Sequence, residues 1–318
     1  MCKKITWKQA MQKVFSQDSG ERARLTVTMK SFQLESRIKL AFNEYGDPRG
    51  EPIFFCHGWP SSLTMATITD AAARELGIRI ISPDRPGISE STFQPDRQLL
   101  DWPPLLRELA DYLAIDQFRV LGISGGAPYA YASAWSMPER VRAIAVISGA
   151  PPISELNDHS GLLRLYRSML KLHRFNPELL RFCFRIVRPF AARRIPIQLR
   201  PLFLRIFQPT DASVLRDNAA FDACFESARR AWRGSVEGVM IDAQVYAEPW
   251  GFRLEDVNVP VRLWHGTKDR AFAFRLAEQV AGRLPNCKLR IVDGAGHFSL
   301  PIRFMGEILA DLIAVQRA

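Results

Sequence analysis

Short apolar runs alternate with longer segments of helical periodicity along most of the chain. The runs are rich in Val, Ile, Leu and Phe and lack the polar alternation of a half-exposed strand. This pattern is typical of buried parallel strands joined by crossover helices, and therefore of the α/β class. It predicts seven strands, at Leu40–Tyr45, Pro52–Cys56, Arg79–Ser82, Arg119–Ile123, Ala143–Ser148, Val261–His265 and Lys288–Val292.

Helical segments lie between these strands. Leu105, Leu106, Leu109 and Leu113 recur at helical spacing just before the strand at Arg119. Further helices are predicted at Ala273–Leu284, which Pro285 and Asn286 end, and at Phe304–Val315. The residues before about Leu25 predict an additional helix attached to the domain.

The alternation stops between about Pro151 and Pro249. Helical periodicity dominates there, and no buried-strand run is evident. We therefore expect a core built from residues 1–150 and 251–318, with residues 151–250 inserted as a helical unit.

The most specific local motif surrounds Ser124. Residues 122–126 read Gly-Ile-Ser-Gly-Gly, a G-x-S-x-G sequence placed after a predicted strand and before a helix of small residues. Such a turn holds the serine in a strained conformation with its hydroxyl exposed, and glycines at 122 and 126 allow the strand and helix to pass closely. The alternative is a glycine-rich turn whose serine only caps the helix.

Two later strands end in residues that complete a nucleophilic site. The strand at Val261–His265 is followed by Asp269, and the strand at Lys288–Val292 is followed by His297 in a glycine-rich loop. A serine needs a base, and the base needs a group that fixes its tautomer. Because ligands gather at the carboxyl ends of parallel strands, these side chains are expected to converge on Ser124.

At this point the sequence resembles the α/β-hydrolase superfamily. The resemblance rests on five segments in the family's order, at residues 57–60 (His-Gly-Trp-Pro), 84–87 (Asp-Arg-Pro-Gly), 122–126, 266–269 (Gly-Thr-Lys-Asp) and 294–297 (Gly-Ala-Gly-His). It implies an α/β-hydrolase core, a mostly parallel twisted sheet flanked by helices, with an inserted helical cap.

The resemblance also implies roles for these residues. Ser124 would be the nucleophile, His297 the general base and then acid, and Asp269 the carboxylate that orients it. The backbone N–H groups of Trp59 and Gly125 would form the oxyanion hole. Structural support at the nucleophile turn and the oxyanion loop is expected from His57, Gly58, Gly122 and Gly126.

Other residues near these motifs have competing interpretations. His57 is expected to brace the oxyanion loop, because His297 already occupies the position of the base, and His265 is likewise interpreted as structural. Asp293 competes with Asp269 as the orienting carboxylate. Asp269 is favoured because the family order is Ser, Asp, His.

Four further residues are interpreted as structural. Asp84 and Arg85 are expected to form a turn pair, and Ser89 replaces the family's second glycine in that loop. Tyr166 and Tyr246 lie in the insertion and are interpreted mainly as packing residues, with substrate contact as the alternative.

The His57–Pro60 motif resembles that of epoxide hydrolases, which carry an aspartate at the nucleophile position. A serine there favours acyl transfer through an acyl-enzyme. The sequence is therefore interpreted as a carboxylesterase-like serine hydrolase. The alternatives are hydrolysis of an amide or a carbon–carbon bond by the same residues, and a non-catalytic protein that binds a small molecule in the capped pocket.

Composition narrows the class of protein further. The 318 residues are 47% hydrophobic and 24% charged, which fits a globular protein with a packed core and excludes disordered, collagen-like and coiled-coil chains. The five cysteines show no close pairing and indicate a reducing compartment. With no signal-peptide pattern and no long apolar run, a cytoplasmic location is expected. No metal or cofactor is implied.

Charge is concentrated in the insertion. The chain has 43 Lys and Arg against 33 Asp and Glu, a net charge of +10, and residues 164–233 alone hold 15 basic and 5 acidic residues. This stretch could contact an anionic membrane and admit lipid-like substrates, recognise an anionic group on a soluble substrate, or form a solvated basic face. No nucleic-acid motif is present. The sequence assigns no oligomeric state.

Overall fold

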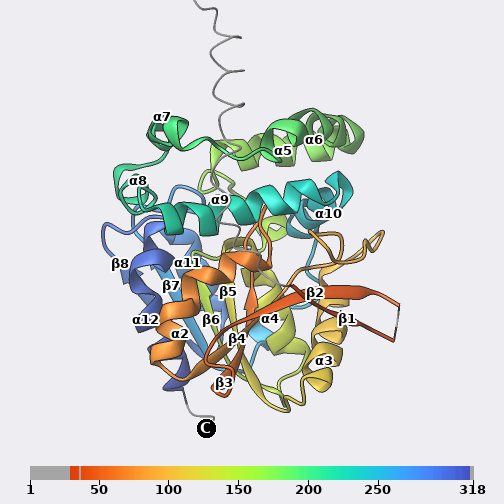
Figure 1. Cartoon of the computed structure of the whole chain (residues 1–318), viewed down its shortest axis with the longest axis vertical. Helices are drawn as coiled ribbons and strands as arrows, with labels where there is room; N and C mark the ends of the chain where they lie inside the picture. The colour runs from red at the N-terminus through yellow and green to blue at the C-terminus, as the bar shows by residue number, and fades with distance from the viewer. Residues whose placement is uncertain (1–28, 36, 316–318) are drawn as a thin grey trace, which may run out of the picture.

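One mixed sheet forms the centre of the protein. The structure, a computed structural model, describes residues 29–35 and 37–315, and eight strands of this part lie in the order β1-β2-β4-β3-β5-β6-β7-β8 (Figure 1). Their bounds are β1 Lys30–Gln33, β2 Lys39–Gly46, β3 Glu51–Cys56, β4 Ile78–Pro83, β5 Phe118–Ile123, β6 Val141–Ile147, β7 Val261–Gly266 and β8 Cys287–Val292.

All seven strands predicted from the apolar runs are present, and β4, β3, β5, β6, β7 and β8 pair in parallel. At one edge β2 pairs antiparallel with β4 and β1 antiparallel with β2, so the sheet is mostly parallel, as expected. Strand β1 was not predicted. It has four residues, three of them exposed, so no buried run marks it.

Helices cover both faces of the sheet. On one face, α2 and α12 pack against residues such as Ile53, Ile80 and Trp264. On the other face, α3, α4 and α11 pack against residues such as Phe54 and Val146. The bounds of these helices are α2 Asp70–Glu75, α3 Trp102–Tyr112, α4 Ala127–Ser136, α11 Phe274–Arg283 and α12 Ser299–Ile313.

Helix α3 carries the predicted leucine spacing, with Leu105, Leu106 and Leu109 buried. The predicted start of the last helix at Phe304 is wrong, since α12 begins at Ser299. It includes Pro301, which a helix tolerates in its first turn because those N–H groups have no intrahelical partner. The helix predicted before Leu25 lies outside the described residues.

Six α-helices occupy the stretch between β6 and β7, and residues 151–250 contain no strand. They are α5 Arg164–Phe175, α6 Pro177–Ala191, α7 Arg200–Phe203, α8 Pro209–Val214, α9 Asn218–Arg233 and α10 Val236–Ala247. Below, these helices and their connections are called the cap segment. Figure 1 shows α9 and α10 next to the sheet, with α5 and α6 outside them.

The cap segment has its own cluster of buried apolar residues, and one residue from the sheet domain, Ile88, belongs to this cluster. Leu180 and Phe184 of α6 pack with Trp232 of α9, Val239 of α10 and Ile88 from the loop after β4. Asn176 begins α6 by accepting a hydrogen bond from Leu179 N at 3.0 Å. Because Ile88 follows the carboxyl end of β4, its contacts place the cap helices over the carboxyl ends of the strands. Ser124, which follows β5, lies at the same edge of the sheet.

None of the helices in the described residues is long and apolar enough to cross a bilayer.

Candidate active site

Ser124 lies in a tight turn between β5 and α4. Its φ of 53° lies in the left-handed region, which side-chain-bearing residues rarely adopt. A Cβ added at Gly126 would lie 1.9 Å from the carbonyl oxygen of Cys56, and one at Gly122 would lie 2.8 Å from that of Gly126. These two glycines are thus required by the close passage of β3, β5 and the turn, as the motif predicts.

The structure brings Ser124, His297 and Asp269 together although they are far apart in the sequence. His297 Nε2 lies 3.0 Å from Ser124 Oγ, and His297 Nδ1 lies 2.8 Å from Asp269 Oδ2. The other oxygen of Asp269 accepts hydrogen bonds from the backbone N–H groups of Ala271 and Phe272, at 2.8 and 3.1 Å. This carboxylate is therefore fixed by its own loop.

The charges of this chain of hydrogen bonds favour one arrangement of protons. Burial lowers the pKa of His297, but the Asp269 carboxylate outweighs it, and the net pKa lies above the ordinary value of 6.5. Burial raises the pKa of Asp269, but the charge and hydrogen bond of His297 outweigh it, and the net pKa is lowered. Asp269 therefore stays ionised, and Nδ1 of His297 carries the proton that it donates to Asp269.

Asp293 and His57 lie away from the hydrogen bond between His297 and Asp269, whereas His265 Nε2 lies 3.6 Å from Asp269 Oδ2. Asp293 is exposed and accepts a hydrogen bond from Thr267 Oγ1 at 2.8 Å, rather than from His297. His265 lies 2.9 Å from the carbonyl oxygen of Phe272, and His57 lies 3.0 Å from that of Gly58. Burial lowers the pKa of both histidines, that of His57 strongly, so both stay neutral. These contacts fit the structural roles expected for His57 and His265.

The backbones of Trp59 and Gly125 adjoin Ser124. A Cβ added at Gly125 would lie 2.9 Å from Trp59 Cβ, and one added at Gly58 would lie 3.5 Å from Ser124 Cβ. The side chain of Trp59 donates a hydrogen bond from Nε1 to the carbonyl oxygen of Val239, at 2.9 Å. The loop that the sequence assigns to the oxyanion hole thus lies beside Ser124 and is attached to cap helix α10.

A buried ion cluster attaches the same loop to the cap segment a second time. Arg85 donates to the carbonyl oxygens of His57 and Gly58 at 2.7 and 2.8 Å, and its guanidinium also binds Asp242 of α10 at 2.7 Å. Burial raises the pKa of Asp242, but Arg85 and Arg97 outweigh it and hold the pKa far below its ordinary range. We call Arg85, Arg97, Tyr129 and Asp242 the Asp242 cluster.

The expected turn pair of Asp84 and Arg85 is therefore wrong. The Asp84 carboxylate instead accepts from Leu63 N at 2.6 Å, and burial raises the pKa of Asp84 to about 7. The two residues point to different partners because Arg85 reaches a charge that only the folded cap segment supplies. Ser89 has a φ of 51°, so this serine adopts the left-handed conformation for which glycine is usual.

A second cap carboxylate holds the loop of His297. Asp211 of α8 is buried, and its Oδ1 accepts hydrogen bonds from the N–H groups of Phe298 and Ser299, at 3.1 and 2.8 Å. Its negative charge contributes to the raised pKa of His297. A Cβ added at Gly296 would lie 2.5 Å from Asp211 Oδ1, so the loop passes the carboxylate too closely for a larger residue.

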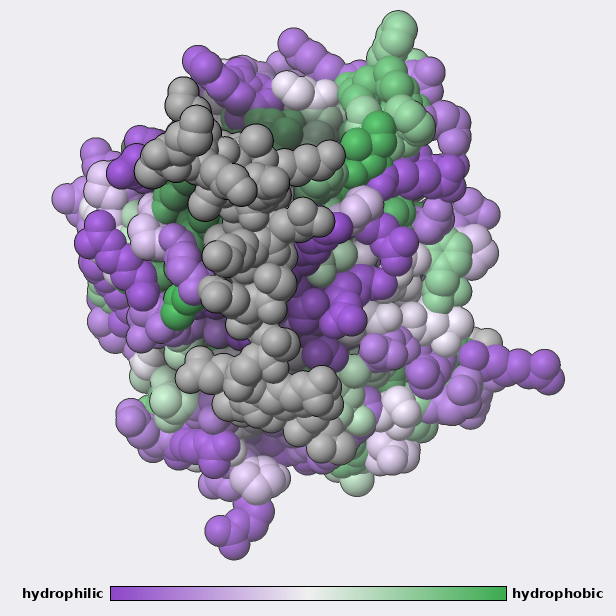
Figure 2. Space-filling view, turned by 45° about the horizontal axis from the view of Figure 1, so that its top comes forward, coloured by the Kyte–Doolittle hydropathy of each residue, from purple (hydrophilic) through white to green (hydrophobic). Residues whose placement is uncertain are grey.

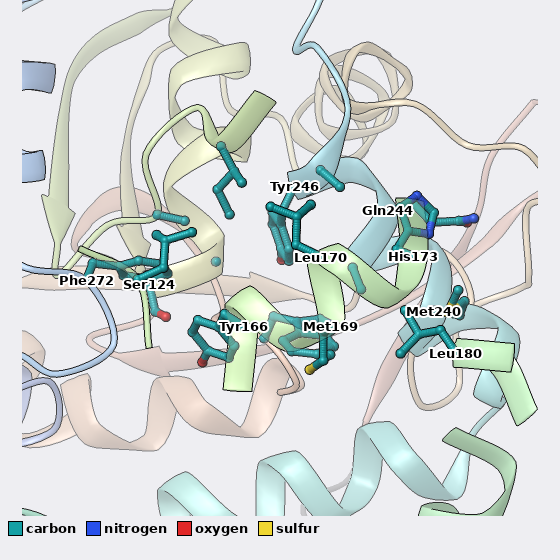
Figure 3. A pocket seen from close by; sticks show the side chains of 17 residues that line it. Ser124, Tyr166, Met169, Leu170, His173, Leu180, Met240, Gln244, Tyr246 and Phe272 are labelled. Carbon is teal, nitrogen blue, oxygen red and sulfur yellow. The ribbon is translucent and has the colours of Figure 1, made fainter. Parts of the chain in front are cut away.

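Two cavities meet at Ser124. The first, here called the apolar pocket, lies between Ser124 and helices α5, α6 and α10. Figure 3 shows Ser124 and Phe272 at one end of it and His173 and Gln244 at the other. Between these ends the walls are apolar, as the lining residues show: Ile153, Leu162, Met169, Leu170, Leu180 and Met240.

The second cavity, here called the wide pocket, has His297 and Arg270 in its lining as well as Ser124. Trp59, Ser124 and Tyr166 line both cavities, and Tyr246 lines the apolar pocket. Tyr246 belongs to the buried apolar core and Tyr166 packs against it, in agreement with their interpretation as packing residues, and both side chains also border space beside Ser124. Their spacing resembles ordinary helix packing, so the sequence alone did not separate the two roles.

Three charged residues of the site were not predicted. Asp242 follows the apolar run Val239–Ile241 in α10, and an acid within a buried stretch of helix is a signal of a hidden partner. Arg97 and Asp211 lie in polar surroundings that give no such signal. In the described residues no group of three or more His, Cys, Asp or Glu side chains could hold a metal ion.

Comparison with known proteins decides the family. The model of the "Alpha/beta hydrolase family" matches residues 53–311, which is most of the chain. The chain belongs to this family. The predicted resemblance and the fold class are confirmed, and family membership supports a hydrolase.

Relatives within the family carry different names. A segment of 114 residues is 27% identical to bifunctional epoxide hydrolase 2 of Sus scrofa, covering 35% of this chain but only 20% of that protein. Over 291 residues the chain is 24% identical to a Bacillus subtilis (strain 168) protein provisionally named 2-succinyl-6-hydroxy-2,4-cyclohexadiene-1-carboxylate synthase, covering 87% of this chain and 95% of that one.

The fold is also similar to that of an esterase from Exiguobacterium antarcticum. That structure superposes with a TM-score of 0.65 at 17% identity, covering 90% of this chain and 99% of the esterase. These names describe different reactions, so the chemistry of this chain has to be argued from its own site.

Proposed function

We propose that this protein is a serine hydrolase that cleaves an ester or related acyl bond. The observation that supports this most is the continuous chain of hydrogen bonds from Ser124 through His297 to Asp269, at 3.0 and 2.8 Å. This is the arrangement that turns a serine hydroxyl into a nucleophile.

The reaction proceeds in two steps. Ser124 Oγ attacks the carbonyl carbon while His297 Nε2 takes its proton, and the N–H groups of Trp59 and Gly125 bind the oxyanion that forms. His297 then gives the proton to the leaving alcohol, and the acyl group stays on Ser124. In the second step His297 takes a proton from water, the hydroxide attacks the acyl carbon, and the acid leaves as Ser124 recovers its proton.

Serine at the turn distinguishes this reaction from epoxide opening, for which the related enzymes use an aspartate. Amide and carbon–carbon bond hydrolysis use the same residues and differ only in the leaving group, so substrates decide among them. A non-catalytic binding protein is disfavoured, because such a protein would need neither the hydrogen bond from His297 to Asp269 nor the left-handed backbone at Ser124.

The apolar pocket is the proposed site of the acyl group. Its walls carry no charged side chain between Ser124 and His173, so an uncharged acyl chain fits it. Burying each additional methylene is worth about 0.8 kcal/mol, or about fourfold in kcat/KM, until the chain reaches the far wall.

The test is a series of p-nitrophenyl esters of increasing acyl length. We expect kcat/KM to rise with length and then fall, and Leu170→Trp, which fills the pocket, to move the maximum to shorter chains. Leu165→Trp is the matched control on the exposed side of the same helix and should leave the maximum unchanged. Ser124→Ala should fold and lose turnover. Full activity in Ser124→Ala would refute the proposed nucleophile, and an unchanged optimum in Leu170→Trp would refute the acyl site.

A further inference from the structure

Helix α6 is apolar on two sides, although only one side is buried. Leu180 and Phe184 face inward, where Leu180 lines the apolar pocket and Phe184 packs near Trp59 and Trp232. A helix that is apolar on all sides is normally buried. The outward side of α6 therefore calls for an explanation.

The outward residues of α6 form one stripe. Leu179, Phe182, Ile186 and Phe190 follow helical spacing and are 42%, 57%, 53% and 70% exposed. We call these four residues the outer stripe. Phe175, at the end of α5, is 84% exposed. Figure 2 shows a hydrophobic patch, in green, at the cap end of the molecule with hydrophilic surface around it. Contiguous exposed apolar surface of this kind marks an interaction site.

The charges around the stripe are positive. Helices α5 and α6 together hold seven Lys and Arg and one acidic residue, Glu178. Lys171 and Arg174 of α5 are exposed and form no salt bridge with another described residue, as also holds for Arg193 beyond the end of α6. Glu178 is itself paired with Arg181. A partner of this face therefore has to be both apolar and anionic.

We propose that the outer faces of α5 and α6 dock on an anionic lipid bilayer, with the outer stripe inserted among the acyl chains and the surrounding Lys and Arg side chains at the headgroups. An amphipathic helix binds an interface in this way, and each basic side chain adds attraction to anionic lipids. A second copy of the chain fits less well, since it would bring two faces of the same positive charge together. The proposal does not depend on the chemistry at Ser124.

Docking in this orientation places the apolar pocket directly beneath the bilayer. Among the described residues, helix α6 separates the pocket from the outer face at Leu180, whose side chain borders the pocket while the stripe is exposed. A lipid-like acyl substrate would then reach Ser124 with little exposure to water.

The test is co-flotation of the full-length protein with vesicles of phosphatidylcholine alone or of phosphatidylcholine mixed with an equal part of phosphatidylglycerol. We expect binding to the anionic vesicles only, and weaker binding at high salt. Phe182→Ser/Phe190→Ser and Lys171→Glu/Arg174→Glu should each lower the partition coefficient about tenfold or more. Tyr112→Ser, which changes a residue 57% exposed on core helix α3, should bind as the unaltered protein does.

Several results would overturn the proposal. These are equal binding to both vesicle types, stripe variants that bind like the unaltered protein, and loss of binding only when residues 1–28 are deleted. Stripe variants that convert a stable dimer into a monomer in sedimentation equilibrium would assign the face to a second copy of the chain. Ser124→Ala should bind vesicles normally, and the stripe variants should hydrolyse a water-soluble ester normally, so failure here is separate from failure of the proposed hydrolase.

Discussion

Helices α4 and α6 are both rich in apolar residues, yet the structure accounts for them differently. Every residue of α4 from Ala127 to Ala134 is buried between the sheet and α3. In α6 only Leu180 and Phe184 are buried, while the outer stripe faces away from the protein. In the core helix α4, the apolar side chains are buried within the protein. In the cap helix α6, part of the apolar surface stays exposed, where a partner could cover it.

The same division separates chemistry from positioning. The core supplies Ser124, His297 and Asp269, all on loops that follow strands. The cap segment supplies Asp242 and Asp211, which hold the loops carrying Trp59 and His297. Predictions that alter one region at a time therefore test whether this division is correct.

The largest effect is expected for the carboxylate beside His297. Asp269→Asn places an amide N–H where Nδ1 of His297 needs an acceptor, so the ring is held in the wrong tautomer and kcat should fall about 10⁴-fold. Asp293→Asn, the matched change at the competing carboxylate, should alter kcat less than threefold, a margin of roughly 0.6 kcal/mol. Steady-state kinetics on a soluble ester measure both. Equal losses in the two variants would reject Asp269.

The next largest effect concerns the contact between cap and core. Asp242→Asn leaves Arg85 and Arg97 buried without a counter-charge, which should lower the free energy of unfolding by about 3–5 kcal/mol. Urea denaturation followed by circular dichroism measures it. Asp217→Asn is a control at an exposed cap aspartate. If Asp242→Asn lowers the free energy of unfolding by less than about 1 kcal/mol, which is usual for a single substitution, the Asp242 cluster does not stabilise the contact between cap segment and core.

A third pair of variants compares the two kinds of apolar residue directly. Leu106→Ala in α3 removes a fully buried side chain and should cost about 2–5 kcal/mol of unfolding free energy. Phe190→Ser in the outer stripe should cost less than about 0.5 kcal/mol, because its ring gains little burial on folding. A large loss for Phe190→Ser would mean that the stripe is covered within the protein.

The smallest effect is a shift in pH dependence. His297 acts as a base only when deprotonated, so kcat/KM should rise through an apparent pKa above 6.5, the ordinary value that Asp269 and Asp211 together raise. Asp211→Asn keeps an acceptor for the N–H groups of Phe298 and Ser299 but removes the charge. The acid limb should therefore move to lower pH. An unmoved limb, or one moved upward, would contradict this role.

Much of this architecture followed from the sequence because its signals are local. Buried strands such as β5 are continuous apolar runs, and the turn at Ser124 needs glycines that can be read directly. Asp269 and His297 could be placed because both follow strands that end at the same edge of the sheet. Strand β1 could not be found, since its short, exposed sequence resembles a loop.

The cap segment was predicted less completely because its contacts are long-range. Arg85 was assigned to Asp84, its neighbour in sequence, while its partner is Asp242, which only the folded cap segment brings near. Tyr166 and Tyr246 have the spacing of packing residues, and their position beside a cavity depends on how α5 and α10 lie on the core. Helical periodicity predicts which side of a helix is apolar, but it does not predict which helices pack against that side.

The most direct test of the proposed chemistry is covalent labelling with a fluorophosphonate, followed by peptide mass spectrometry. The account predicts one adduct per chain, on Ser124, formed rapidly by the unaltered protein and at least about 10³-fold more slowly by His297→Ala, because the hydroxyl then lacks its base. An adduct on any other residue, or labelling of His297→Ala at the unaltered rate, would contradict it.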